Sequence, residues 1–302
     1  MCWPGRCACG HVALIAIVSR RHVATWAARE PRIGALSRAI SATCTRAWDS
    51  GTIIMLTDPQ VASFFREGFL VCPSLAAAET IRAVRERGGA FVASLENPRE
   101  GEDGRWTPSV FDHVDPAKDA ALHALLKDDA VCAAATQLLG SPARVYYGML
   151  AVVPPNGGHG LPWHQDNMYS HILGGALNCF VALETITPDK ATLWVAPRSH
   201  LEGVRPNRHN TTTAEGHREA LVPPDESDGV QMPTLHAGDV VIFDRYCLHR
   251  SGQNNTGTPR FAYAAQLAVG ETVILLHPPL PSVGVTIGME RERQQNDSLV
   301  NG

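Results

Sequence analysis

Two side chains with metal-binding chemistry lie two positions apart near the middle of the chain. The segment reads Trp163-His164-Gln165-Asp166, and imidazole and carboxylate groups are both common ligands of divalent metals. In an extended strand, residues i and i+2 project to the same face. We therefore expect His164 and Asp166 to lie on one strand and to bind one cation as adjacent ligands.

A third ligand is required, because two ligands make a weak site, and His249 is the candidate. It ends the segment AGDVVIFDRYCLH, which has the pattern of a turn, a buried strand and a polar tip. Two histidines and one carboxylate on one face of an octahedron leave three positions open, which is the arrangement of oxygen-activating iron(II) sites. A structural zinc site would instead be closed by four ligands.

An isolated His-x-Asp pair is weak evidence, because short motifs match by chance. The chain contains a second pair, His113-Val114-Asp115, which precedes a proline and lies outside any strand pattern. The prediction that His164 and Asp166 bind a metal therefore depends on the residues around His249.

Arg260 follows His249 by eleven positions and precedes an apolar segment, 261–269. The connection is rich in turn residues, so two antiparallel strands joined there would bring His249 and Arg260 close together. A buried guanidinium needs an anion and binds a carboxylate through two parallel hydrogen bonds. An iron site with an arginine deeper in the same cavity fits a small dicarboxylate. The alternative, a surface arginine in an ion pair, competes only if His249 is not a ligand.

Together these segments resemble one known family. HQD, LWVAPRSH and AGDVVIFDRYCLHRSGQNNTGTPR, with the opening TDPQVASFFREGFLVCPSL, look like the phytanoyl-CoA dioxygenase family of iron(II)- and 2-oxoglutarate-dependent oxygenases. The resemblance covers about residues 56–269. It implies a double-stranded β-helix, with iron(II) bound by His164, Asp166 and His249. It also implies that Arg260 binds the co-substrate 2-oxoglutarate, assisted by Ser251.

The resemblance further implies the reaction. O2 and 2-oxoglutarate would give succinate and CO2 while a small organic metabolite is hydroxylated, for example in natural-product biosynthesis. Desaturation, cyclisation, epoxidation or hydroxylation of an acyl-CoA are alternatives, and a jelly-roll ligand-binding module is the non-enzyme alternative. The chain has no lysine and arginine cluster suited to the phosphates of coenzyme A, which favours a free metabolite.

The sequence departs from the family pattern at two turns. The usual PGSH is Pro197-Arg198-Ser199-His200, and the glycine often found before the LW strand is replaced around Lys190-Ala191. We expect Arg198 to change the turn or the rim of the pocket. Because position 166 is an aspartate and not a small residue, halogenating relatives, which leave that position to chloride, are a poor fit.

The substrate contacts are predicted from position alone. Four residues are candidates because they flank the ligands or lie on a strand that could line the barrel: Trp163, Asn167, Tyr169 and Tyr147. Core packing is an equally good interpretation of the aromatic ones. Alternation along a strand predicts that only one of Tyr146 and Tyr147 points inward. Asn178 or Phe180 is expected to border the co-substrate.

The elements around these residues predict a mainly β fold with flanking helices. Thr57 and Gln60 form a capping box before a helix with Val61, Phe64 and Phe65 on its apolar face. Further helices are expected at 74–87 and 117–139. Strands are expected at 144–153, 177–186, 192–195, 239–243 and 261–269. Short strands after a helical start indicate a jelly-roll, cupin-like fold with helices packed on one sheet.

The chain divides into an extension and one domain. Residues 1–54 contain seven arginines, no lysine and two acids, and we interpret them as a disordered or non-native extension, with a transit peptide as the alternative. Residues 55–302 are expected to form a single dioxygenase domain. Residues 202–233 are polar and too long for a simple turn, which is typical of a lid or binding loop.

Composition limits the partners. The chain has 302 residues, a net charge of −4 and no lysine- or arginine-rich run, which argues against nucleic acid. Its longest early apolar run is too short to span a bilayer. The eight cysteines include no Cys-x-x-Cys pair, which argues against structural zinc, and the four after residue 55 are scattered singly, which favours a reducing cytoplasm. A small-molecule substrate is the expected partner, and the sequence leaves the oligomeric state open.

Overall fold

The computed structural model describes most of the chain between residues 56 and 276. The described ranges are 56–95, 110–112, 121, 124–125, 128–173, 175–210, 217–269 and 273–276. The interpretation of residues 1–54 and the second His-x-Asp pair, 113–115, lie outside the described residues. Within those ranges, no helix is long and apolar enough to cross a membrane.

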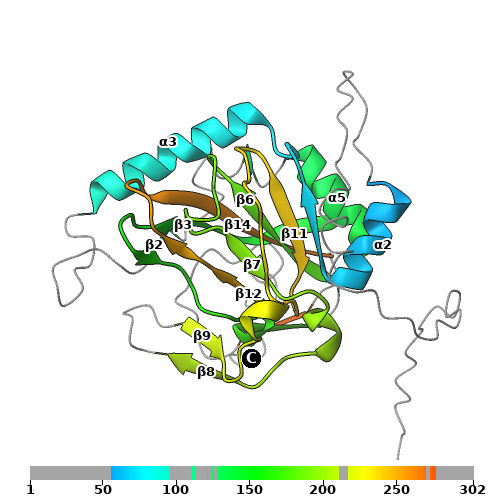
Figure 1. Ribbon diagram of the computed structural model, residues 1–302. Helices are drawn as coiled ribbons and strands as arrows, with labels where there is room; N and C mark the ends of the chain where they lie inside the picture. The colour runs from blue at the N-terminus through cyan, green and yellow to red at the C-terminus, as the bar shows by residue number, and fades with distance from the viewer. Residues whose placement is uncertain are drawn as a thin grey trace, which may run out of the picture.

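The larger of two facing sheets contains most of the expected strands (Figure 1). Its order is β1-β11-β6-β14-β3-β2, and every neighbouring pair is antiparallel. The strands are β1 (Phe69–Cys72), β2 (Val110–Asp112), β3 (Ala143–Val153), β6 (Ala176–Ala182), β11 (Val240–Asp244) and β14 (Arg260–Val269). The four long strands expected in this sheet are therefore confirmed, although β6 ends at Ala182 and not at Ile186.

A smaller sheet forms the opposite wall. It has the order β10-β7-β12, and β4 pairs with β13 beside it. These strands are β4 (Gly158–His159), β7 (Leu193–Val195), β10 (Val230–Gln231), β12 (His249–Ser251) and β13 (Gln253–Asn254), and a separate pair joins β5 (Ser170–Leu173) to β15 (Val273–Leu276). Phe180 and Val241 of the larger sheet pack with Leu193 and Val195 of the smaller one. The two sheets therefore enclose one core, which confirms the predicted jelly-roll.

Strand β6 shows why its sequence is apolar at nearly every position. Leu177, Cys179 and Val181 belong to a core between the larger sheet and the helices. Phe180 and Ala182 belong to the core between the two sheets. Because successive side chains of a strand point to opposite faces, a strand covered on both sides is apolar on both. Asn178 is therefore a polar residue facing the interior of the barrel, and it is buried.

Three helices cover the outer face of the larger sheet, as Figure 1 shows. They are α2 (Asp58–Glu67), α3 (Ala78–Ser94) and α5 (Asp129–Leu139). At the start of α2, the Thr57 N–H donates to Gln60 Oε1 (2.8 Å), as the capping box predicts. Phe64 is buried, but Phe65 is exposed, so the expectation that both lie on the apolar face is wrong for Phe65.

The other two expected helices differ from their predicted ranges. Helix α3 starts at Ala78 and not at Ser74, which has a positive φ of 50°. Helix α5 starts at Asp129 because the Asp128 side chain accepts hydrogen bonds from the N–H groups of Ala130 and Val131. An aspartate that caps a helix favours a helix start at that point. Residues 121, 124 and 125 are helical, but the helix is interrupted at Asp128, so the expectation of one continuous helix over 117–139 is wrong.

The polar segment expected to be a lid contains a hairpin. Strands β8 (Asn207–Asn210) and β9 (His217–Ala220) pair with each other, and the short helix η4 (Glu226–Asp228) leads into β10. In Figure 1 the hairpin lies at the opposite end of the molecule from α3. The Ala220 N–H donates to the Trp163 carbonyl (2.8 Å), which ties the hairpin to the segment before His164. The role of this segment as a lid stays a prediction.

Both departures from the family's turn glycines coincide with left-handed backbone. Arg198 has φ 66° and Ala191 has φ 50°, values that glycine adopts at little cost. The turn at Arg198 is kept: its N–H donates to the Glu67 carbonyl (2.8 Å), and the short helix η3 (Ser199–Glu202) follows. The turn is therefore retained, although Arg198 has a β-carbon and adopts a strained backbone conformation there.

We expect Arg198→Gly to stabilise the protein by about 0.5–1 kcal/mol. A left-handed residue with a β-carbon costs about 1–2 kcal/mol, and the greater freedom of glycine in the unfolded chain offsets part of the gain. The Arg198 side chain is 63% exposed and its ion pair with Glu67 is long (3.9 Å), so its loss costs little. Urea unfolding measures the difference, with Arg198→Ala as the control that keeps the β-carbon. Equal stability of the two variants would contradict the prediction.

Candidate metal centre

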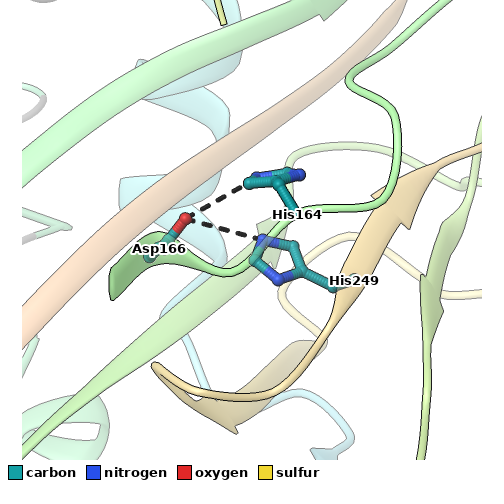
Figure 2. Close-up of side chains that lie close together, drawn as sticks. All are labelled: His164, Asp166 and His249. Atoms are coloured by element: carbon teal, nitrogen blue, oxygen red, sulfur yellow. Dashed lines mark ion pairs between the residues drawn. The ribbon is translucent and has the colours of Figure 1, made fainter. Parts of the chain in front are cut away.

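The three expected ligands meet at one point between the sheets. The nearest ligand atoms of His164, Asp166 and His249 all lie within 4.8 Å of one another. Asp166 Oδ1 is 3.6 Å from Nε2 of His164 and 3.7 Å from Nε2 of His249. Figure 2 shows the two imidazoles and the carboxylate pointing toward one another. One cation placed among these atoms can contact all three.

The segment that carries His164 and Asp166 is not the regular strand that the spacing predicts. His164 forms a single bridge with His249, and Asp166 begins the short helix η2 (Asp166–Met168). His164 and Asp166 still project to one side, because the intervening Gln165 has an extended backbone (φ −120°, ψ 141°). Gln165 points the other way: its side chain donates to the Gly203 carbonyl (2.9 Å) and accepts from the Arg205 N–H (2.8 Å). The strand expectation is wrong, but the shared direction of the two ligands is retained.

Backbone carbonyl groups set the tautomer of both imidazoles. Nδ1 of His164 lies 2.8 Å from the Pro162 carbonyl oxygen, and Nδ1 of His249 lies 3.0 Å from that of Cys247. A carbonyl oxygen only accepts, so each Nδ1 carries the hydrogen and each Nε2 directs its lone pair toward Asp166. Burial and the neighbouring His249 lower the pKa of His164 to about 3, so this imidazole is neutral at physiological pH.

This donor set fits a divalent metal. Two imidazole lone pairs and a carboxylate oxygen converge without a hydrogen atom between them, and such atoms repel one another unless a cation lies among them. Two histidines and one carboxylate are the ligands of non-haem iron(II) oxygenases. When iron(II) is bound, His164, Asp166 and His249 would hold it and leave the remaining positions open toward the cavity.

Arg260 lies in the same cavity and is 1% exposed. Its Nη2 donates to Ser251 Oγ (3.1 Å) and its Nη1 to the Ala151 carbonyl (3.3 Å). Its Nε is buried and has no hydrogen-bond partner among the described residues. Burial lowers the pKa of Arg260 to about 10, which still leaves the group charged at neutral pH. A buried guanidinium with an unused donor fits an anionic group such as the far carboxylate of a keto-diacid.

Several residues that the sequence did not single out complete the cavity. Phe111, Met149 and Phe243 contribute apolar side chains to its lining, and Gln266 lines it beside Asp166. Asn178 and Phe180, the residues expected near the co-substrate, both line it. Nδ2 of Asn178 is buried without a hydrogen-bond partner among the described residues, so it is a second donor available to a bound ligand.

The four candidate substrate contacts lie around the cavity and do not line it. Trp163 packs with Met168 and Leu248 in a separate buried cluster. Asn167 Oδ1 accepts from Arg245 Nε (2.9 Å). The Tyr169 ring stands edge-on to His164, and its hydroxyl accepts from the Arg218 N–H (2.9 Å). Tyr147 reaches the cavity wall indirectly, because its hydroxyl donates to Met149 Sδ (3.5 Å).

A shift of strand register lies beside Tyr146 and Tyr147, and neither of them lines the cavity. The pairing of β14 with β3 shifts register between Gln266 and Leu267, so Gln266 pairs with Tyr147 and Leu267 with Val145. Such a bulge sets two residues of one strand against one of its partner. The Tyr146 hydroxyl donates to Gln266 Oε1 (2.8 Å), while Tyr147 contacts Met149. Both hydroxyls therefore reach residues that line the cavity.

Comparison with known proteins agrees with this geometry. The sequence model of the family described as phytanoyl-CoA dioxygenase matches residues 64–262, more than half of the chain. The L-proline trans-4-hydroxylase of Streptomyces griseoviridis is 29% identical over 225 residues, covering 65% of this chain and 80% of that protein. The ectoine dioxygenase of Sphingopyxis alaskensis is 27% identical over 227 residues, covering 67% and 72%.

Solved structures show the same fold. The epimerase SnoN in complex with Fe3+, alpha ketoglutarate and nogalamycin RO matches with a TM-score of 0.60 at 20% identity, covering 76% of this chain and 91% of that one. EctD from S. alaskensis with 2-oxoglutarate and 5-hydroxyectoine matches with a TM-score of 0.57 at 22% identity, covering 82% and 84%. From the family match over residues 64–262 and the His-Asp-His triad beside a buried arginine, the chain belongs to the phytanoyl-CoA dioxygenase family and is an iron- and 2-oxoglutarate-dependent dioxygenase.

Proposed function

We propose that this enzyme hydroxylates a small organic metabolite and releases succinate and CO2 from 2-oxoglutarate. The observation that carries the proposal is the cavity between the sheets, where the triad, Arg260 and Ser251 share one space with apolar lining residues. The named activities of two relatives support it, because L-proline and ectoine are both small molecules. We also propose a cytoplasmic location, which is consistent with cysteines that are scattered singly through residues 55–302.

Each group in the cavity has a distinct task in this proposal. Iron(II), when bound with 2-oxoglutarate, supplies the power to activate O2 and oxidise the substrate. The triad holds the metal, and Arg260 with Ser251 binds the far carboxylate of 2-oxoglutarate. The apolar side chains of Phe111, Met149 and Phe243 exclude water from the reacting centre.

A free metabolite is favoured over an acyl-CoA. Among the described residues that line the cavity, Arg260 is the one permanently charged cation, and the proposal assigns it to 2-oxoglutarate. The phosphate groups of coenzyme A are usually bound by several lysine or arginine side chains. Such a set does not line this cavity within the described part of the chain.

Two measurements test the proposal in sequence. Anaerobic titration of the iron(II) protein with 2-oxoglutarate is expected to give the visible charge-transfer band of a chelated 2-oxo acid. A panel of amino acids, cyclic amino-acid derivatives, small phosphonates and acyl-CoA thioesters is then screened for stimulated succinate release. Product masses decide the outcome: a gain of one oxygen atom supports hydroxylation, and a loss of two hydrogen atoms shows desaturation or cyclisation. Stimulation only by thioesters would overturn the preference for a free metabolite.

A further inference from the structure

A buried guanidinium lies directly behind the wall of the metal site. Arg245, on the turn after β11, is 2% exposed and does not line the cavity. Its Nη1 donates to Gln266 Oε1 (2.7 Å) and to Asn178 Oδ1 (3.3 Å), and its Nη2 donates to the Asp166 carbonyl oxygen (3.1 Å). Arg245 therefore donates hydrogen bonds to the backbone of one metal ligand, Asp166. It also donates to the side chains of two polar residues that line the cavity, Gln266 and Asn178.

These contacts fix which way the Gln266 amide faces. A guanidinium group only donates hydrogen bonds, so the atom of Gln266 beside Arg245 is its carbonyl oxygen. The Tyr146 hydroxyl donates to the same oxygen (2.8 Å). The amide nitrogen must then point the other way, where Nε2 donates to Asp166 Oδ2 (2.9 Å). The orientation of Gln266 is thus set by donors on the side remote from the metal.

Arg245 also orients the Asn178 amide. It pairs directly with Gln266 across β6 and β14, and its carbonyl oxygen also accepts from Arg245. Its amide nitrogen is left without a hydrogen-bond partner among the described residues. One guanidinium therefore directs two neighbouring amide groups so that their N–H donors are on the metal side of the wall.

We propose that Gln266, oriented by Arg245, is a positioning residue that keeps Asp166 a one-oxygen ligand. The Gln266 side-chain N–H donates to Oδ2 of Asp166, so Oδ1 of Asp166 is the oxygen that faces Nε2 of His164 and His249. A carboxylate bound through both oxygens would fill one of the three positions that the triad leaves open. With iron(II) bound, the positions left open would be needed by the co-substrate and O2. The inference rests on the metal site and does not depend on which metabolite is oxidised.

Two substitutions of Gln266 test this role. Gln266→Met has a similar length but no donor for Asp166. Gln266→Glu keeps an acceptor for Arg245 and Tyr146 and replaces the donor facing Asp166 with an oxygen. We expect both to weaken anaerobic iron(II) binding by about 10–100-fold, the usual effect of removing an outer partner of a metal ligand. At saturating iron(II), we also expect a weaker or shifted 2-oxoglutarate charge-transfer band, because Asp166 can rotate.

The same changes at Gln253 provide matched controls, since this amide is exposed on β13 and its side chain bonds to the Gly157 carbonyl. Gln253→Met and Gln253→Glu are expected to keep wild-type iron affinity and band. Thermal unfolding of the metal-free proteins separates positioning from a purely structural role. Unchanged iron affinity and band in both Gln266 variants, whether or not the metal-free protein is less stable, would overturn the proposal. Weaker binding or an altered band in a Gln266 variant that still folds supports it.

Discussion

Asp166→Ala is expected to reduce 2-oxoglutarate-dependent succinate formation by more than about 100-fold. Loss of an outer partner already costs about 10–100-fold in metal affinity or activity, and this change removes a ligand itself. It takes away the only carboxylate of the triad and leaves two neutral imidazoles to hold a dication. It also leaves the Gln266 amide without its acceptor. The amount of succinate released at saturating iron(II) and 2-oxoglutarate measures the effect. Anaerobic iron(II) titration shows whether the loss comes from weaker metal binding.

The second His-x-Asp pair supplies a control for this variant. Asp115→Ala makes the same chemical change in the other short motif and is expected to keep wild-type turnover and iron affinity. Circular dichroism should show that both variants are folded. Near-normal turnover by Asp166→Ala would reject the assignment of Asp166 as a ligand, whatever the result at Asp115.

The ligands were predictable because their chemistry is local. His164 and Asp166 are two positions apart, and an extended residue between them is enough to direct both side chains to one side. A full strand is not required for this shared direction, and Asp166 in fact begins a helical turn. His249 and Arg260 were predictable for a related reason: a turn-rich connection links β12 to β14 and returns the chain to the same cavity.

The surroundings of the site were harder to predict because they depend on register. Counting in twos from Arg260 along β14 reaches Ala262, Ala264 and Gln266, so the sequence could have indicated that Gln266 points inward. It could not indicate that Gln266 lies opposite Asn178 or within reach of Asp166. Those contacts depend on how β6 and β14 are aligned, and no spacing within either strand fixes that alignment.

Irregular backbone accounts for most of the remaining errors. Beside the bulge at Gln266 and Leu267, two adjacent tyrosine hydroxyls both reach residues that line the cavity, which simple alternation does not predict. Asp128 starts a helix inside a segment that has continuous helical periodicity. At Arg198 the chain keeps a left-handed turn without the glycine that would have marked it. In each case the backbone departs from what hydrophobic periodicity, strand alternation or turn composition alone predicts.

Arg260→Ala is expected to raise the KM for 2-oxoglutarate by about 30-fold or more. Truncating one partner of a buried, hydrogen-bonded charge pair costs about 2–5 kcal/mol. Arg260→Lys should fall between the wild type and the alanine variant, because an ammonium group keeps the charge but cannot form the parallel pair of hydrogen bonds. Initial rates of succinate formation give the KM values.

Arg85→Ala is a matched control for this position. Arg85 stacks on the ring of the adjacent Phe261 at 3.6 Å and pairs with Glu184, but it contacts β14 from the helical side and does not line the cavity. Its loss is expected to leave the KM for 2-oxoglutarate unchanged. A similar rise in KM in both variants would indicate a general disturbance of β14 and would contradict a direct contact between Arg260 and the co-substrate.

A co-substrate that lacks the far carboxylate makes the test of Arg260 specific. The iron-chelating end of 2-oxobutyrate matches that of 2-oxoglutarate, but it has no second carboxylate for a guanidinium to bind. The wild type should prefer 2-oxoglutarate strongly, and Arg260→Ala should lose most of that preference by weakening 2-oxoglutarate alone. If two groups interact, removing either one makes removal of the other nearly neutral. A preference that survives in Arg260→Ala would mean that another residue binds the far carboxylate.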